Sequence, residues 1–223
     1  MLVAMSAFAV VPVKALLKSK TRLSNFFTPQ ERQLFTLAML EDVLNALKSS
    51  GVDENVVVGS DEAVEEFVKS YGMVFLREEQ EGLNQALNQA MKWCAARHAR
   101  AVLTLPADVP TITTRDVNRL VGLAMGNSIV ISPSHNGGTN AFLQTPPGIV
   151  PPSFGSESFG KHLQKASARQ VRVRIFVSAN IMLDIDYEAD LEKLLKVGQH
   201  TASHRFLKQV AWKSGCRPFT GKL

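Results

Sequence analysis

The sequence predicts one α/β domain with a mostly parallel central sheet flanked by helices. Short apolar runs typical of buried strands alternate along the chain with segments that carry helix caps or a helical apolar period. The clearest strand covers residues 101–105, and the clearest helix covers residues 83–94, where apolar side chains recur at helical spacing. We expect residues 1–196 to form this domain and residues 197–223 to form a C-terminal helical appendage.

The composition is that of a globular, cytoplasmic protein. At 223 residues, with 45% hydrophobic and 20% charged residues, the chain is long enough to bury a sizeable core. The two cysteines, Cys94 and Cys216, fit neither a zinc ribbon nor a disulfide framework, which favours a reducing compartment. The apolar N-terminus lacks the basic region of a signal peptide, and no later segment is apolar for long enough to span a bilayer. We therefore expect no membrane partner.

The charge balance favours small anionic ligands. A net charge of +5 and a pI near 9.3 permit substrates such as nucleotides. No run of Lys and Arg, and no basic stripe interleaved with aromatic residues, accompanies this charge. We therefore expect no nucleic-acid partner.

Local signals predict the elements in chain order. Apolar runs predict strands at residues 7–13, 55–58, 73–76, 101–105, 128–132, 139–144 and 171–177. Caps and apolar periodicity predict helices at residues 28–51, 61–70, 83–94, 113–125, 158–168, 188–195 and 199–213. The sequence Asn136-Gly137-Gly138 is typical of a hairpin turn between two of the strands.

The first helix has the strongest start signal. Thr28 and Glu31 have the spacing of a capping box, and Pro29 occupies the first helical position. The apolar stripe of this helix is expected to comprise Leu34, Leu37, Leu44 and Leu47. N-caps of later helices are expected at Asp61 and at Thr113 or Thr114.

A basic loop follows the first strand. Its cations are Lys14, Lys18, Lys20 and Arg22. Backbone amides and several cations make a good cradle for a triphosphate, and the place after the first strand of an α/β sheet favours that role over a solvated surface loop. The loop is not a Walker A loop, because it has no Gly-rich GK[ST] pattern.

Carboxylates follow two of the predicted strands. Asp108 lies just beyond the strand at 101–105, between Pro106 and Pro110, while Asp184 and Asp186 follow the strand at 171–177. Mg²⁺ prefers one or two carboxylates together with phosphate oxygens and water. The alternatives are an ordinary Asx turn at Asp108 and a helix cap at Asp186.

Two glycine-containing segments also carry polar side chains. They are Gly137-Gly138-Thr139-Asn140 and Phe154-Gly155-Ser156-Glu157-Ser158. Glycine allows close approach of backbone to a ligand, and a helix N-terminus near Ser158 favours an anion, although both segments are also well-formed turns. The five histidines (His98, His135, His162, His200 and His204) show no zinc-protease spacing, and no G-x-S-x-G elbow is present, which disfavours covalent acyl chemistry.

These pieces, in this order, resemble one family. The matching motifs are Val11-Pro12-Val13-Lys14, Lys20-Thr21-Arg22-Leu23, Gly82-Leu83-Asn84, Pro106-Ala107-Asp108-Val109-Pro110, Gly137-Gly138-Thr139-Asn140, Phe154-Gly155-Ser156-Glu157-Ser158-Phe159 and Asp184-Ile185-Asp186. Over roughly residues 5–196 the chain resembles the 2-phospho-L-lactate guanylyltransferases of coenzyme F(420) biosynthesis. Their broader relatives are nucleotidyltransferases of the glycosyltransferase-A type. The resemblance implies that fold, and transfer of GMP from GTP to a phosphorylated three-carbon acid with release of pyrophosphate.

The resemblance also implies roles for individual residues. Catalytic roles fall to Lys14, Arg22 and Asp108, and nucleotide binding to Lys14, Lys20, Arg22, Gly82, Asn84 and Asp108. The phospho-acid would be held by Thr139, Gly155 and Ser158, and Mg²⁺ by Asp108 and Asp184. One departure is Pro106-Ala107 before Asp108, where many sugar nucleotidyltransferases have Gly-Asp.

Alternatives remain open on this scaffold. The acceptor acid could be 2-phospho-L-lactate, phosphoenolpyruvate or 3-phosphoglycerate, and a non-catalytic nucleotide-binding subunit is a further alternative. Retention of Asp108, Asp184 and the basic loop argues against the non-catalytic subunit. The tail helix could support a homodimer, or its apolar residues could cover the domain's own core; they are Phe206, Leu207, Val210 and Trp212.

Overall fold

In the computed structural model, which describes residues 6–213, one seven-stranded sheet forms the centre of the protein. The strands are β1 (Ala7–Val13), β2 (Glu54–Gly59), β3 (Val74–Arg77), β4 (Ala101–Thr104), β5 (Ser128–Pro133), β6 (Thr139–Thr145) and β7 (Arg172–Ile175). Their order across the sheet is β3-β2-β1-β4-β6-β5-β7. All pairings are parallel except those of β6, which runs antiparallel to both β4 and β5. The predicted fold class, α/β with a mostly parallel sheet, is confirmed.

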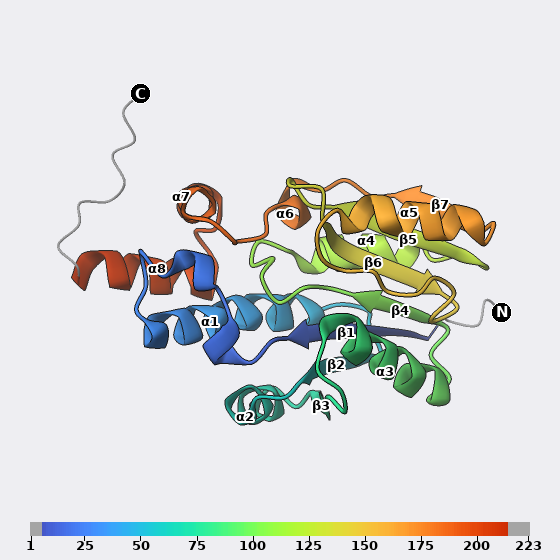
Figure 1. Ribbon diagram of the computed structural model, residues 1–223, viewed down its shortest axis with the longest axis horizontal. Coiled ribbons are helices and arrows are strands. Elements are labelled where there is room, and N and C mark those ends of the chain that lie inside the picture. The colour runs from blue at the N-terminus through green and yellow to red at the C-terminus, as the bar shows by residue number, and fades with distance from the viewer. Residues whose placement is uncertain (1–5, 214–223) are drawn as a thin grey trace.

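Helices cover both faces of the sheet (Figure 1). The α-helices are α1 (Pro29–Lys48), α2 (Glu62–Ser70), α3 (Leu83–Ala96), α4 (Thr114–Gly122), α5 (Ser158–Ala168), α6 (Ala179–Met182), α7 (Glu188–Val197) and α8 (Ala202–Lys213). Two short 3₁₀ helices, η1 (Leu16–Lys18) and η2 (Thr21–Leu23), lie in the loop between β1 and α1. The helices α1, α2 and α4 pack on one face of the sheet, and α3 and α5 pack on the other.

The expected caps are confirmed. Thr28 and Glu31 form both hydrogen bonds of a capping box at α1, with Pro29 in the first turn. Thr113, one of the two candidates, caps α4 through a second capping box with Asp116. Asp61 accepts a hydrogen bond from a backbone N–H in the first turn of α2.

The expected apolar stripe of α1 is wrong at Leu34. This side chain is 48% exposed, while Leu44 and Leu47 are buried as expected. The helix is buried on two sides, because one side packs on the sheet and another contacts α8. Phe35 and Met39 face this second contact and are fully buried. The buried stripe is therefore wider than a single leucine row and excludes Leu34.

The C-terminal helix α8 packs against α1 and α7. Leu207 and Val210 join a buried cluster with Phe35, Leu191 and other residues, and Phe206 packs against it. Asp42 of α1 accepts hydrogen bonds from the backbone of Ala202 and Ser203 at the start of α8. This packing accounts for those apolar residues without a second copy of the chain. The Trp212 side chain and Cys216 lie outside the described residues.

The strand order creates a candidate ligand-binding position at the carboxyl ends of the central strands, which form one edge of the sheet. From β1 and β4, which are parallel neighbours, the sheet continues to β2 on one side and to β6 on the other. In open α/β sheets, ligands bind outside the carboxyl ends of the strands at such a switch point. Because β6 is antiparallel, its amino end also lies at this edge. No helix within residues 6–213 combines the length and hydrophobicity that crossing a bilayer requires.

Candidate active site

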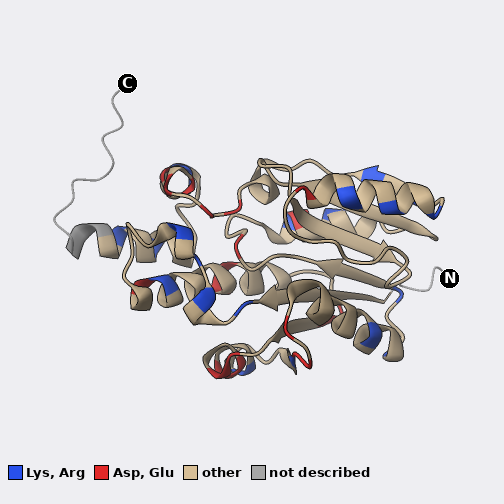
Figure 2. Ribbon diagram, in the orientation of Figure 1, with Lys and Arg blue, Asp and Glu red and all other residues tan. Residues whose placement is uncertain are grey.

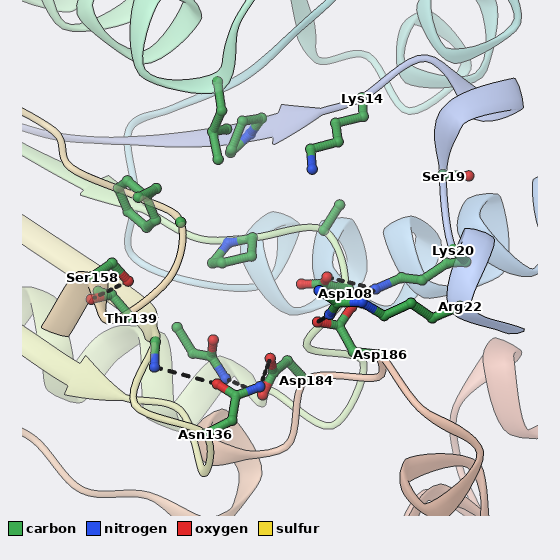
Figure 3. A pocket seen from close by; sticks show the side chains of 18 of the residues that line it. Lys14, Ser19, Lys20, Arg22, Asp108, Asn136, Thr139, Ser158, Asp184 and Asp186 are labelled. Carbon is green, nitrogen blue, oxygen red and sulfur yellow. Dashed lines mark hydrogen bonds and ion pairs between the residues drawn. The ribbon is translucent and has the colours of Figure 1, made fainter.

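A cavity of about 600 Å³ opens at this edge of the sheet. Segments from distant parts of the sequence form its walls: the β1–α1 loop, the loop after β4, the β5–β6 turn, the start of α5 and the segment before α7. Among the predicted site residues, those that line the cavity are Lys14, Lys20, Arg22, Asp108, Thr139, Gly155, Ser158 and Asp184. Figure 3 shows the charged residues at one end and the Thr139 and Ser158 hydroxyls at the other.

Lys20 lies at the centre of the charged end. Its Nζ atom is 2.7 Å from Asp108 Oδ2 and 3.0 Å from Asp186 Oδ1, and its side chain is only 8% exposed. Lys20 precedes η2 with φ 48°, a left-handed conformation that is costly for a residue other than glycine. Burial alone would lower the pKa of the Lys20 ammonium, but the charges and hydrogen bonds of Asp108 and Asp186 outweigh it and raise that pKa. Lys20 therefore stays charged.

The other cations of the basic loop surround this cluster. Arg22 Nη1 is 3.2 Å from Asp186 Oδ2, and the Arg22 guanidinium lies 4.9 Å from the centre of the Tyr187 ring. Lys14 points into the cavity from the end of β1, apart from the Lys20–Asp108 cluster (Figure 3). The basic loop therefore presents several cations to the cavity, whereas the exposed Lys18 pairs with Glu81 at 2.8 Å.

Asp184 is a buried carboxylate held by amides. Asn140 Nδ2 donates to its Oδ1 at 3.2 Å, and Asn136 Nδ2 donates to its Oδ2 at 3.4 Å. Burial raises the pKa of Asp184; the hydrogen bond from Asn140 opposes this, while the negative charges of Asp108 and Asp186 add to it. The backbone N–H of Ile185 donates to the Asp108 carbonyl at 3.0 Å, which ties the two acidic segments together. Figure 2 shows acidic residues on these neighbouring loops.

The acidic cluster suits a hard cation that also binds phosphate. Within the described part of the chain, no group of three or more His, Cys, Asp or Glu side chains is arranged to hold a metal ion by itself. Two carboxylates with phosphate oxygens and water are, however, the usual ligands of Mg²⁺. Asp108 and Asp184 supply such oxygens on the same cavity, and the negative charge of Asp108 adds to the rise that burial causes in the pKa of Asp184, so the two carboxylates interact. The residues present therefore fit this ion.

The other end of the cavity, which carries the Thr139 and Ser158 hydroxyls, leaves room for a ligand to approach the backbone closely. Thr139 begins β6 and Ser158 begins α5, and the Ser158 hydroxyl donates to Thr139 Oγ1 at 3.2 Å. Gly155 has φ +123°, a conformation that side chains rarely adopt. Glu157 occupies the N-cap position of α5 with φ 54° and makes no side-chain capping hydrogen bond, so two strained or glycine-dependent residues shape this wall.

His162, which lies behind this wall, was not among the predicted site residues. Its side chain is fully buried, stacks on Phe142 with ring centres 4.3 Å apart, and lies 3.1 Å from Thr139 Oγ1 through Nδ1. Burial, with a smaller contribution from the charge of Lys165, lowers the pKa of His162 to about 4. The sequence could have indicated this position, because His162 lies one helical turn after Ser158 and the two residues therefore share one face of α5.

The buried His162 predicts a loss of stability in mild acid. The unfolded chain takes up a proton on this residue below about pH 6.5, whereas the folded protein does so only near its pKa of about 4. Stability is therefore full above pH 6.5 and falls by roughly 3 kcal/mol as the pH decreases to 4. Denaturant unfolding of the wild type and of His162→Gln at each pH checks this. If the free energy of unfolding changed with pH equally in the two proteins, this prediction would be wrong.

Two predicted nucleotide-binding residues do not line the cavity. Gly82 and Asn84 lie at the start of α3, and Asn84 instead binds the backbone of Phe154. Asn84 Nδ2 donates to the Phe154 carbonyl at 3.1 Å, and Asn84 Oδ1 accepts from the Phe154 N–H at 2.8 Å. The side chain thus anchors the segment that carries Gly155. A sequence pattern cannot reveal such a contact between residues 70 positions apart.

Comparison with known sequences identifies relatives over most of the chain. The family model "Guanylyl transferase CofC like" matches residues 7–217. A protein from Rubrobacter xylanophilus named phosphoenolpyruvate guanylyltransferase is 45% identical over 85% of this chain and 94% of its own length. A protein from Methanothermobacter thermautotrophicus named 2-phospho-L-lactate guanylyltransferase is 36% identical over 92% of both chains.

Solved structures share the fold at much lower identity. A nucleotidyl transferase from Methanothermobacter superposes with a TM-score of 0.65 at 17% identity, covering 93% of this chain and 100% of the other. A cytidylyltransferase from Leptospira borgpetersenii superposes with a TM-score of 0.60 at 16% identity, covering 95% of each. These matches confirm a nucleotidyltransferase-type fold. With the family model and the sequence relatives, they show that the chain belongs to the CofC-like guanylyl transferase family of enzymes.

Proposed function

We propose that this protein transfers GMP from GTP to 2-phospho-L-lactate, forming lactyl-2-diphospho-guanosine and pyrophosphate in coenzyme F(420) biosynthesis. The observation that carries the proposal is the two-ended cavity, with cations and carboxylates at one end and hydroxyls beside a helix N-terminus at the other. The charged end fits a nucleoside triphosphate, and the other end fits a small phosphorylated acid. Family membership supports the guanylyl group as the one transferred.

The reaction needs no covalent enzyme intermediate. An oxygen of the acceptor phosphate attacks the α-phosphorus of GTP, a new P–O bond forms, and the bond to the β-phosphate oxygen breaks so that pyrophosphate leaves with the electron pair. The attacking oxygen is already anionic, so no strong general base is required. The protein contributes alignment of the two phosphates and stabilisation of charge on the leaving group.

The charged end of the cavity would stabilise the charge that develops on the leaving pyrophosphate. Lys14 and Arg22, which both line the cavity, would supply positive charge to the triphosphate. The Lys20 ammonium has three donors, and its contacts with Asp108 and Asp186 use two of them, leaving a third for a phosphate oxygen. Mg²⁺ held by Asp108 and Asp184 would further neutralise phosphate oxygens when bound.

The end of the cavity with the Thr139 and Ser158 hydroxyls would align the acceptor. Thr139 and Ser158 offer hydroxyls, and Gly155 offers backbone with no side chain in the way. Ser158 is also the first residue of an 11-residue helix, whose positive N-terminal end favours an anion, while the Ser158 and Phe159 N–H groups donate to the Gly155 and Gly137 carbonyls. Together these groups suit a compact acid that carries both phosphate and carboxylate.

Phosphoenolpyruvate is the second candidate acceptor. The observation that favours it is the relative from Rubrobacter xylanophilus, which is 45% identical to this chain and is named phosphoenolpyruvate guanylyltransferase. The two acids differ only in saturation of the three-carbon chain, so the same phosphate and carboxylate contacts serve both.

Pyrophosphate release separates these candidates. The purified protein with Mg²⁺ and GTP is assayed with 2-phospho-L-lactate, phosphoenolpyruvate and 3-phosphoglycerate, and the product is identified by mass. We expect turnover with a 2-phosphorylated acid and GTP, and weaker turnover with ATP or CTP. Absence of pyrophosphate with every acid would refute the proposal and favour a non-catalytic nucleotide-binding subunit.

Asn84→Asp should weaken binding of the acceptor acid selectively. An aspartate still accepts from the Phe154 N–H but cannot donate to the Phe154 carbonyl, so the segment that carries Gly155 loses one anchor. We expect the KM for the acid to rise about fivefold and the KM for GTP to change little. If Asn84 contacted the nucleotide instead, steady-state kinetics would show the larger rise in the KM for GTP.

A further inference from the structure

The imidazole of His162 has contacts on both ring nitrogens. The backbone N–H of Ser153 donates to His162 Nε2 at 2.9 Å, and Nδ1 lies 3.1 Å from Thr139 Oγ1. The ring stacks on Phe142, and Phe154 meets it edge-on with ring centres 5.0 Å apart. The residue is therefore held in one place and one orientation, directly behind the Thr139 hydroxyl that lines the cavity.

The contacts of the ring decide its tautomer. A backbone N–H can only donate, so Nε2 must carry a lone pair. The ring is fully buried between apolar rings, an environment that disfavours the doubly protonated cation. The single ring proton therefore lies on Nδ1, and Nδ1–H donates to Thr139 Oγ1.

This tautomer determines the direction in which the Thr139 hydroxyl can donate its hydrogen. Thr139 Oγ1 accepts from His162 Nδ1–H and also from the Ser158 hydroxyl at 3.2 Å. A hydroxyl oxygen has two accepting lone pairs, and both are then occupied. The Thr139 hydroxyl hydrogen remains available for an acceptor within the cavity.

We propose that His162 is a positioning residue which makes Thr139 a hydrogen-bond donor toward an anionic oxygen of the acceptor acid. The inference rests on the proposed function, because it assumes that the phospho-acid occupies this end of the cavity. Phosphate and carboxylate oxygens only accept hydrogen bonds, so a fixed donor recognises them better than a hydroxyl that can turn either way. His162 acts through Thr139 and does not touch the substrate.

Two substitutions at His162 separate this role from simple packing. His162→Gln offers an oxygen for the Ser153 N–H but no N–H at the place of Nδ1. His162→Asn offers an amide N–H near that place but loses the contact with Ser153. We expect His162→Gln to raise the KM for the acid about tenfold with the KM for GTP within about twofold, and His162→Asn to recover most of the affinity.

A double-mutant cycle with Thr139→Val tests whether His162 acts through Thr139. If it does, adding His162→Gln to Thr139→Val raises the KM for the acid no further than Thr139→Val alone. Independent, multiplying effects of the two substitutions would overturn the inference, as would an equal rise in the KM values for acid and GTP. Melting temperatures of all four proteins show that each is folded at the assay temperature.

Nitrogen NMR of the ring gives a readout that does not depend on activity. With ¹⁵N-labelled histidine, the resonances lost in His162→Gln identify this ring, and we expect the Nδ1–H tautomer at neutral pH. An Nε2–H tautomer or a protonated ring would overturn the inference. Wild-type protein that releases no pyrophosphate with either 2-phosphorylated acid would remove the proposed function and this inference with it. If the wild type is active but the two substitutions change the KM for the acid independently, only the inference about His162 is overturned.

Discussion

Replacing Asp108 with Asn is expected to lower kcat for pyrophosphate release by about 1,000-fold with only a modest fall in the melting temperature, because Asp186 still pairs with the buried Lys20 ammonium. Asn has the shape of Asp and still offers an oxygen to the Lys20 ammonium, which contacts Asp108 Oδ2 at 2.7 Å. The backbone contact from Ile185 to the Asp108 carbonyl is also unaffected. The variant loses only negative charge, which the proposed metal–nucleotide complex requires.

Glu188→Gln is the matched control for Asp108→Asn. Glu188 is an exposed carboxylate in the first turn of α7, two residues after Asp186 in the sequence. Its replacement removes the same charge from the same region without touching the cavity. Near-normal turnover in Asp108→Asn, or an equal loss in Glu188→Gln, would show that no specific role belongs to Asp108.

Replacing Lys20 with Met should affect both stability and activity. The substitution leaves Asp108 and Asp186 facing each other without the ammonium that now lies between them. Removing one partner of a buried ion pair is strongly destabilising, and partial exposure of these carboxylates reduces the cost to about 2 kcal/mol. We expect kcat to fall at least about 100-fold, because the triphosphate also loses a donor.

Lys20→Met should also make stability depend on Mg²⁺. Without the ammonium, a divalent cation can take its place between the carboxylates, so millimolar Mg²⁺ should raise the melting temperature more in the variant than in the wild type. The control is Lys69→Met, which breaks an exposed pair with Glu65 of similar length, 2.8 Å, and should leave stability nearly unchanged. An unchanged melting temperature in Lys20→Met would show that Lys20 does not hold the carboxylates together.

The sequence predicted those parts of the site that follow from strand ends. Lys14 comes directly after β1 and Asp108 soon after β4, and the carboxyl ends of neighbouring parallel strands meet at one edge. Thr139 was assigned from the family resemblance, and the antiparallel direction of β6 brings it to the same end of the sheet. Periodicity and caps likewise sufficed for most helices.

Contacts between distant segments could not be predicted in the same way. Lys20 and Asp186 are separated by 166 positions, and Asn84 and Phe154 by 70, so no local pattern records either contact. Leu34 was misplaced because α8 gives α1 a second buried side. The short helix α6 was missed because its four residues are too few to show a period.

We propose that Asp108 and Asp184 hold one divalent cation together with the nucleotide. The most direct test is a titration of Mn²⁺, followed by electron paramagnetic resonance, into the protein with GTP present. We expect Asp108→Asn and Asp184→Asn each to weaken Mn²⁺ binding at least about tenfold and Glu188→Gln to leave it unchanged. Binding as tight as in the wild type in either Asp108→Asn or Asp184→Asn would contradict it.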